Sequence, residues 1–353
     1  KVLGRIDLSV ADDGRPLGAD DYRHPDFSWS AYAAAYDPAT WGRRPPAGPL
    51  EEARRASAKA QAARVVVAVP SRTTLIGWGP DAALVNGGLS LNNVQDVIVR
   101  NLRLSDPYDH FPAWDPKDND HGEWNSEYDN IVLRAAERVW IDHCTFDDGD
   151  RPDAAEPVLL GRPLQRHDGL LDITRGSNHI TVSWNHFRHH DKTNLVGGSD
   201  RHAEDEGRLK VTFHHNLWEQ TKARSPRVRF GQVHVYNNLY LIDDPAGFEY
   251  SIGVGYKSAV YSQRNAWQIP ATLSPVSLIR AYKGDAFEDH DSVVNGRPAN
   301  LHALLSASQP TVNFKATVGW TPTPGPELDL ADQVPDRVRA GAGAGRLWTA
   351  PRP

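Results

Sequence analysis

Residues 180–187 read ITVSWNHF, and the same pattern returns as VTFHHNLW at 211–218 and VHVYNNLY at 233–240. Apolar and polar residues alternate along each run, which predicts a β-strand with one buried face. Each run also places an asparagine two positions before a bulky aromatic residue. Including related runs at 98–104, 139–146 and 260–267, the equivalent positions are Asn101, Cys144, Asn185, Asn216, Asn238 and Asn265. One structural unit is therefore used repeatedly along the chain.

The spacing of this repeat predicts a solenoid. The last four asparagines are separated by 31, 22 and 27 residues, which suits one coil with inserted loops of variable length. Asparagines at the same corner of successive coils can stack their side-chain amides and hold the bend. An antiparallel sandwich is the alternative, but it should contain more two-residue Asn-Gly or Asp-Gly turns than this chain has. We therefore expect an all-β parallel solenoid that forms a single domain over residues 1–353.

An insertion interrupts the β pattern near the N-terminus. Residues 20–48 are rich in Tyr, Trp and Pro and predict a loop. Residues 49–64 predict the best helix in the chain, because Pro49 suits the first helical position, two glutamates follow it and alanine is abundant. We therefore expect residues 20–64 to form a loop-plus-helix insertion.

The remaining segments predict strands and a tail. Residues 2–10 (VLGRIDLSV) predict a first strand, and residues 65–70 (VVVAVP) predict a short buried strand closed by proline. Beyond them the helical signal nearly vanishes. Residues 322–353 are rich in Pro, Gly and Ala, which predicts a C-terminal tail that packs loosely on the solenoid.

Composition excludes several classes of protein. A hydrophobic content of 39% and eleven tryptophans exclude a disordered chain, and no apolar stretch is long enough to span a membrane. The net charge of −6 argues against a nucleic-acid partner. With Cys144 as its one cysteine the chain has no intrachain disulfide. It has no methionine, not even at its start, so we expect a processed chain from which a signal peptide could have been removed.

Three aspartates are candidates for a metal site. Asp168 and Asp172 flank a predicted turn, and Asp129 lies about two coils earlier, where stacking could bring it alongside them. Three carboxylates with water suit Ca²⁺, which prefers six to eight oxygen ligands. Solvated turn aspartates are the alternative. The fifteen histidines lack the spacing of a zinc site, and we expect His167 and the pairs at 189–190 and 214–215 to lie at corners or on the surface.

Basic residues cluster shortly after these aspartates. Residues 188–229 hold nine Lys or Arg against six Asp or Glu, in a chain that is otherwise acidic. Strand alternation puts Arg227 and Arg229 on one face, whereas Pro226 interrupts the pattern before Arg224. Arginine binds carboxylates with two parallel hydrogen bonds. An acidic polymer bridged by metal would suit this combination, and a solvated surface cluster is the alternative.

Several of these motifs together resemble the pectate lyases, polysaccharide lyase family 1, and in particular its secreted Bacillus-type branch. The resemblance covers nearly the whole chain and rests on HDGLLDI, ITVSWNHF, HHDKTNLVGGSD, RSPRVRFGQVHVYNN, VWIDHCTF and AYDPATWGRRPPAGPLEEAR. It implies a right-handed parallel β-helix with three sheets, one short N-terminal helix and long inserted loops. It also implies an extracellular monomer that cleaves de-esterified polygalacturonate (pectate) with Ca²⁺ and leaves 4,5-unsaturated products.

The resemblance also implies roles for individual residues. Asp129, Asp168 and Asp172 match the family's primary Ca²⁺ ligands. Lys192 and Arg229 match its substrate-binding residues, and Arg224 matches its catalytic base. Arg227 matches no assigned position and is expected to point away. Arginine normally stays protonated in proteins, so Lys192 remains the second candidate for the base.

Other readings stay open from the sequence. Asp142 and His143 could form a catalytic dyad, although the resemblance implies a structural role for their motif. Cys144 departs from the ladder of asparagines and is expected to pack as a small buried residue. The acidic loop 146–153 could hold a further Ca²⁺ or could be solvated.

Alternative functions are a polygalacturonase-type hydrolase and a non-catalytic, Ca²⁺-stabilised solenoid that binds polysaccharide. A hydrolase needs two carboxyl groups across the scissile bond, for which Asp168 and Asp172 could serve. Arginines and a lysine beside such an acid fit that role poorly. A lyase acting on methylated pectin is disfavoured, because neutral esters do not call for a cation site with Arg and Lys.

Overall fold

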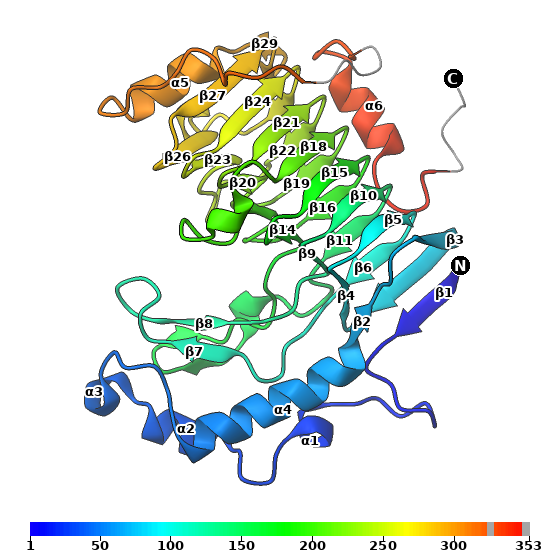
Figure 1. Cartoon of the computed structure of the whole chain (residues 1–353), viewed down its shortest axis with the longest axis vertical. Coiled ribbons are helices and arrows are strands. Elements are labelled where there is room, and N and C mark those ends of the chain that lie inside the picture. Colours follow the sequence, from blue (N-terminus) through cyan, green and yellow to red (C-terminus); the bar gives the residue numbers. More distant parts are fainter. Residues whose placement is uncertain (323–327, 348–353) are drawn as a thin grey trace.

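A computed structural model describes residues 1–322 and 328–347. The chain winds into a right-handed parallel β-helix, which confirms the predicted fold class (Figure 1). The first sheet contains β2 (Val66–Ala68), β4 (Gly88–Asn92), β9 (Ile131–Arg134), β14 (Leu171–Thr174), β17 (Leu195–Val196), β20 (Arg227–Val228), β23 (Ile252–Gly255) and β26 (Ile279–Tyr282). Every pairing in this sheet is parallel.

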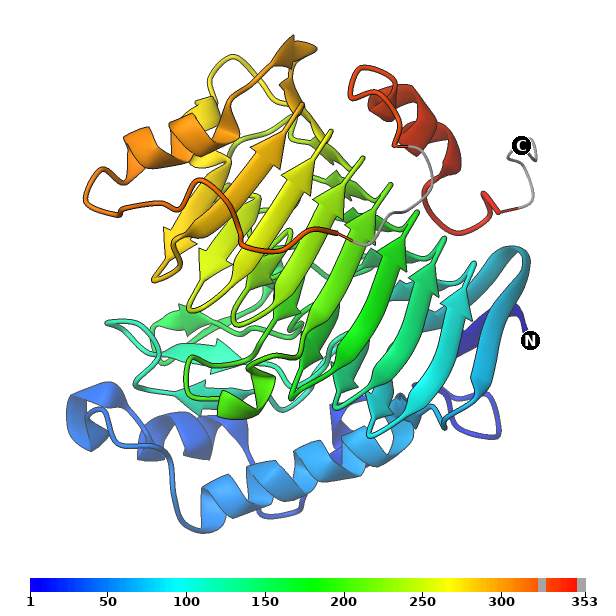
Figure 2. The same ribbon diagram turned by 45° about the horizontal axis from the view of Figure 1, so that its top comes forward.

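Two further sheets complete the coil and are joined through the long strand β3 (Thr73–Val85). The second sheet continues with β5 (Gln95–Arg100), β10 (Glu137–Asp142), β15 (Asn178–Ser183), β18 (Lys210–His214), β21 (Gln232–Tyr236), β24 (Ala259–Gln263) and β27 (Ala286–His290). The third contains β1 (Val2–Asp7), β6 (Arg103–Ser105), β11 (Thr145–Asp147), β16 (His186–Arg188), β19 (Leu217–Glu219), β22 (Leu239–Leu241), β25 (Ala266–Gln268), β28 (Val293–Val294) and the antiparallel β29 (Arg297–Pro298). Figure 2 shows the second sheet as a row of parallel arrows.

The predicted asparagine ladder forms the corner between the second and third sheets. The side-chain amide of Asn185 donates to Asn216 Oδ1 at 3.1 Å, Asn216 donates to Asn238 at 3.0 Å, and Asn238 donates to Asn265 at 3.0 Å. Cys144 occupies the preceding step and is fully buried, as expected. Its backbone N–H donates to Asn185 Oδ1 at 2.8 Å, so the ladder continues through the main chain.

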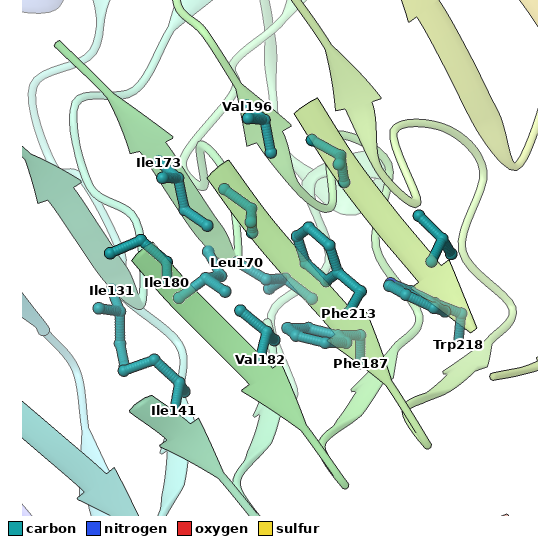
Figure 3. Close-up of a cluster of buried hydrophobic side chains, with 14 of the residues drawn as sticks. Ile131, Ile141, Leu170, Ile173, Ile180, Val182, Phe187, Val196, Phe213 and Trp218 are labelled. Atoms are coloured by element: carbon teal, nitrogen blue, oxygen red, sulfur yellow. The ribbon is translucent and has the colours of Figure 1, made fainter. Parts of the chain in front are cut away.

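The bulky residue of each repeat fills the interior of the coil (Figure 3). Phe146, Phe187, Trp218, Tyr240 and Trp267 stack in that order, with neighbouring ring centroids 4.3–5.7 Å apart and nearly parallel planes. Stacked aromatic pairs contribute about 0.5–1.5 kcal/mol each beyond the area that they bury. The ladder and the aromatic stack therefore fix the register of successive coils from the same short motif.

The N-terminal insertion is more helical than the sequence predicted. The expected helix is present as α4 (Pro49–Val65), but the predicted loop also contains α1 (Ala19–Tyr22), α2 (Trp29–Ala35) and α3 (Pro38–Trp41). These helices pack beside the antiparallel pair β7 (Ala113–Asp115) and β8 (Glu123–Asn125). The helices and this strand pair share a second hydrophobic core, separate from the interior of the coil, in which Tyr32 and Trp124 are fully buried. The prediction of a loop failed because the Tyr- and Trp-rich segment is stabilised by packing and not by helix propensity.

Two later helices were also not predicted. They are α5 (Leu301–Ser308) and α6 (Val334–Gly341). Val334 and Val338 of α6 are fully buried against the third sheet, so this part of the tail is tightly packed. Residues 323–327 and 348–353 of the expected tail lie outside the described residues. Among the helices of residues 1–322 and 328–347, none has the length and apolar character needed to cross a membrane.

Candidate active site

The predicted site residues lie on consecutive turns that lead into the first sheet. Asp129 precedes β9, Asp168 precedes β14, Lys192 precedes β17 and Arg224 precedes β20. The turns are bonded to one another: Asp168 N donates to the Tyr128 carbonyl at 3.2 Å, and Lys192 forms a parallel bridge with the residue before Arg224. Because stacked strands lie about 4.8 Å apart, the coil brings distant parts of the sequence into one site.

Two of the three predicted metal ligands converge. Asp129 and Asp172 are buried on either side of Gly169. A Cβ atom added at Gly169 would lie 2.6 Å from Asp172 Oδ1 and 2.8 Å from Asp129 Oδ1, so any larger residue would fill the space between the carboxylates. The backbone N–H of Gly169 donates to Asp129 Oδ1 at 2.7 Å, and that of Leu195 donates to Asp172 Oδ1 at 3.0 Å.

The electrostatics of this carboxylate pair favour a cation. Burial, and then the charge of Asp168, raise the pKa of Asp172 to about 7. Burial, and then the charge of Asp172, raise the pKa of Asp129 well above its usual value. Each carboxylate makes ionisation of its neighbour harder, and a bound cation relieves that repulsion. The space at Gly169 and the raised pKa values together fit an oxygen-liganded cation.

Asp168 does not join the other two aspartates. Its carboxylate forms an ion pair with Lys192, with Nζ 2.7 Å from Oδ1. Across residues 1–322 and 328–347, no three His, Cys, Asp or Glu side chains meet in an arrangement that could hold a metal ion. The structure thus brings together two members of the predicted ligand set and directs the third towards the predicted substrate-binding lysine.

The basic residues line a groove of about 610 Å³. Its floor includes Lys192, Arg224 and Arg227, together with Arg280 and Tyr282 of β26, and its other side includes residues of β8 and of the loop that precedes it. Arg227 was expected to point away, but the structure places it in the groove. Neither Arg280 nor Tyr282 was predicted, because nothing near them in the sequence resembles the site.

Arg229 lies in a neighbouring hollow that it shares with Arg227, as strand alternation predicts. Its Nε donates to Asp200 Oδ1 at 3.0 Å and its Nη1 donates to the Gly197 carbonyl at 2.9 Å. Burial, and then the charge of Arg227, lower the pKa of Arg229, while Asp200 acts in the opposite direction. Asp200 also binds Lys283 at 2.7 Å, so a single carboxylate holds two basic side chains beside the groove.

The chain is similar in sequence to known proteins. A model of the pectate lyase family matches residues 49–325. A pectate lyase of Bacillus subtilis (strain 168) is 43% identical over 350 residues, which cover 98% of this chain and 81% of that protein. This chain belongs to the pectate lyase family. Membership confirms the predicted enzyme class, a lyase acting on polysaccharide.

Solved pectate lyases share the fold over the same length. A thermostable pectate lyase has a TM-score of 0.94 and 44% identity, covering 98% of this chain and 85% of that chain. A pectate lyase bound to a hexasaccharide has a TM-score of 0.91 and 42% identity, with the same coverage of both chains. Both likenesses cover nearly the whole of this chain.

The acidic loop of this pectate lyase family member is partly paired with basic side chains, while residues 149–152 are exposed to solvent. Asp147 is buried and binds Arg103 and Arg188 at 3.2 and 2.7 Å. Asp148 binds His190 at 2.8 Å. Two of the loop's carboxylates are therefore paired within the protein, and a further Ca²⁺ in this loop stays a prediction.

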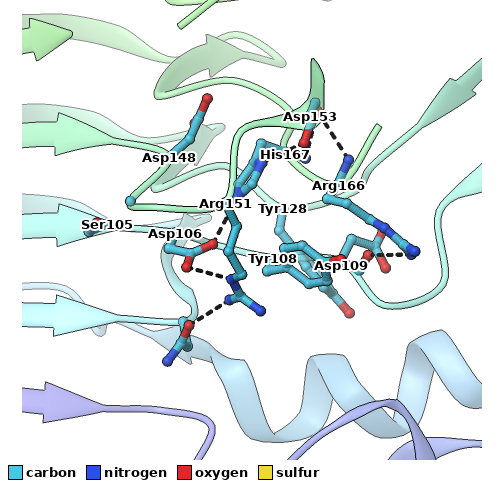
Figure 4. A network of polar contacts seen from close by, with 12 residues as sticks. Ser105, Asp106, Tyr108, Asp109, Tyr128, Asp148, Arg151, Asp153, Arg166 and His167 are labelled. Atoms are coloured by element: carbon cyan, nitrogen blue, oxygen red, sulfur yellow. Dashed lines mark hydrogen bonds and ion pairs between the residues drawn. The ribbon is translucent and has the colours of Figure 1, made fainter. Parts of the chain in front are cut away.

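His167 lies at the centre of the neighbouring polar network (Figure 4). Its Nδ1 is 2.7 Å from Asp153 Oδ1 and its Nε2 is 2.9 Å from Asp106 Oδ1, and its side chain is 1% exposed. Burial lowers the pKa of His167, but the hydrogen bonds to the two aspartates outweigh it and raise the pKa to about 9. This charged imidazole was expected at a corner or on the surface, yet it is buried one residue before Asp168.

The alternative dyad is part of the asparagine corner. Asp142 is buried and binds His143 at 2.7 Å, Arg100 at 2.8 Å and Ser183 at 2.6 Å. It ends β10 in the second sheet, whereas the groove residues lead into the first sheet. These contacts agree with the structural role that the family resemblance implied.

Proposed function

We propose that the chain cleaves de-esterified α-1,4-polygalacturonate by Ca²⁺-dependent β-elimination and releases 4,5-unsaturated oligogalacturonides. The observation that carries the proposal is the pairing of Lys192 and Arg224 on adjacent turns of one groove, beside the carboxylate pair at Gly169. An anionic polymer suits this floor, because Lys and Arg bind carboxylates through charge-assisted hydrogen bonds.

The carboxylate pair would hold the cation. Asp129 and Asp172 supply oxygen ligands, and Asp168 becomes a third when Lys192 turns from it to a substrate carboxylate. Ca²⁺ held there would supply positive charge to the substrate carboxylate and would so make the neighbouring C5 proton more acidic. The pKa of Asp172, raised to about 7, supports this proposal, because a bound cation would stabilise the ionised carboxylate. The closeness of Lys192 to Asp168 supports an exchange of partners on binding.

Arg224 is the proposed base. The Lys192 ammonium is paired with Asp168, or with the substrate carboxylate once it turns from Asp168, whereas Arg224 forms no ion pair with any carboxylate among the described residues. Arg224, in its neutral guanidine form, takes the C5 proton, the electrons of the C5–H bond form the C4–C5 double bond, and the C4–O bond breaks. The departing oxygen acquires a proton, and no water is consumed. Lys192 and Arg229 stabilise the negative charge that develops on the substrate carboxylate.

Ultraviolet absorbance of polygalacturonate tests the proposal. We expect absorbance to rise when protein and Ca²⁺ are added, because the product double bond is conjugated with a carboxylate, and we expect a chelator to stop the rise. Boiled protein serves as the control for non-enzymatic elimination. New reducing ends without new absorbance would indicate hydrolysis and contradict the proposal. A rise that persists with chelator would contradict the metal dependence alone.

We also propose that the protein acts outside the cell as a monomer. Pectate is a polymer outside the cell that is too large to be taken up intact, and the groove is built from one chain in the described residues. Light scattering coupled to size-exclusion chromatography should give a mass near 39.1 kDa for this chain. A dimer mass would contradict this part of the proposal.

A further inference from the structure

Arg227 and Arg280 lie on the same outward face of the first sheet. Arg227 is in register with Gly253, and Gly253 is in register with Arg280, so the two arginines are two coils apart, or about 10 Å along the helix axis. A Cβ added at Gly253 would come within 2.9 Å of the Tyr250 ring and 3.0 Å of Arg227 Cγ. The glycine between the arginines therefore leaves room for Arg227 to lie along the groove floor.

Tyr282 joins the two arginines. The Arg227 guanidinium lies 4.1 Å from the centroid of its ring, and the Arg280 guanidinium lies 5.1 Å from it. The ring also packs against the buried Tyr250 at 5.2 Å between centroids. Cationic groups are attracted to the face of an aromatic ring, and here these contacts hold two cationic groups in place at one end of the groove.

The positive charge of these arginines is not neutralised by the protein. Among the described residues, neither Arg227 nor Arg280 forms an ion pair with an Asp or Glu, although Glu249 lines the same groove. Arg227 Nε is buried without a hydrogen-bond partner. Lys192 and Arg229, in contrast, each have a carboxylate partner within 3.0 Å. A buried donor without a partner is costly, so the arrangement indicates an anionic ligand.

We propose that Arg227, Arg280 and Tyr282 form a distal subsite, which binds the carboxylate of a galacturonate unit remote from the bond that is cleaved. Arg280 lies four coils, or about 19 Å, beyond Asp172 along the first sheet. A sugar at Arg280 is therefore not the sugar beside the carboxylate pair. The subsite rests on the proposed function and makes the enzyme prefer longer chains whose distal unit is unesterified.

Chain-length dependence tests the subsite. We compare hexagalacturonate with trigalacturonate in the presence of Ca²⁺, for the parent protein and for Arg280→Gln. Arg280 is exposed, so the substitution should leave the fold intact. We expect kcat/KM for the hexamer to fall about tenfold relative to the trimer, through KM and not kcat, because a charge-assisted hydrogen bond is lost. Arg280→Lys should restore part of the preference, since it keeps the charge.

Arg175→Gln is the matched control. Arg175 is exposed, pairs with Glu204 at 3.0 Å and lies outside the groove, so its loss changes the net charge equally. We expect this variant to retain the parent's chain-length preference. A parent protein without lyase activity would overturn the proposed function itself. If the parent is active, unchanged preference in Arg280→Gln overturns the subsite alone, and so does an equal loss for both oligomers.

Discussion

Replacing Asn216 by alanine removes the middle step of the asparagine ladder. Asn216 Oδ1 accepts from the Asn185 backbone at 3.0 Å and from its amide at 3.1 Å. Its own amide donates to the Val182 carbonyl at 2.9 Å and to Asn238 at 3.0 Å. The substitution leaves the Asn185 N–H without its acceptor and takes a donor from the Val182 carbonyl, both in the protein interior. At about 1–3 kcal/mol for each such group, we expect the free energy of unfolding to fall by about 4 kcal/mol.

Equilibrium unfolding in urea, followed by far-ultraviolet circular dichroism, measures this loss. Asn313→Ala is the matched control, because Asn313 is exposed and removal of a surface amide should change the free energy of unfolding by less than about 0.5 kcal/mol. A loss below about 1 kcal/mol for Asn216→Ala, with reversible transitions and an unchanged slope, would refute the reasoning. It would mean that the aromatic stack alone holds the coils in register.

Three further predictions concern the groove and its surroundings. Arg224→Lys should lower kcat at least 100-fold while KM for polygalacturonate stays within about threefold, as measured by product absorbance, because the base is lost but a basic side chain still lines the groove; turnover within a few-fold of the parent would exclude Arg224 as the base. The raised pKa of His167, about 9, means that its stabilising charge is present below about pH 6.5 and is lost as pH rises through 9. The free energy of unfolding should therefore decline between pH 6.5 and 9, and His167→Gln should remove that decline. Without Ca²⁺, the raised pKa of Asp172 means that the folded state loses stability as pH rises from about 4 to 7. Asp172→Asn should then melt higher than the parent at pH 8 and show a smaller rise in Tm on adding Ca²⁺; an equal rise would argue against Asp172 as a ligand.

Much of the fold could be predicted from local sequence. The strand alternation, the ladder positions such as Asn216 and Asn238, and the helix beginning at Pro49 depend on residues within one coil. The short helices of the insertion could not be predicted, because they are stabilised by contacts such as Tyr32 with Trp124, whose ring centroids lie 6.1 Å apart across more than ninety positions of sequence.

Part of the site could be predicted as well. The candidate site residues were expected near one another, and the structure places them on adjacent turns: Asp129, Asp168, Lys192 and Arg224. The sequence did not indicate that Asp168 binds Lys192, that Arg227 faces the groove or that Arg280 joins it. Each of these depends on the register between coils and on the lengths of intervening loops, which no local pattern records.

By itself, then, the sequence determined the repeating unit of this protein, because alternation and a corner asparagine act within a few residues. It also placed the carboxylates ahead of the basic residues along the solenoid. Only the tertiary structure decided which of these charges neutralise each other and which remain available to a ligand. Ion pairing depends on separations of a few ångströms, and the stacking of coils sets those separations for residues such as Arg227 and Arg280.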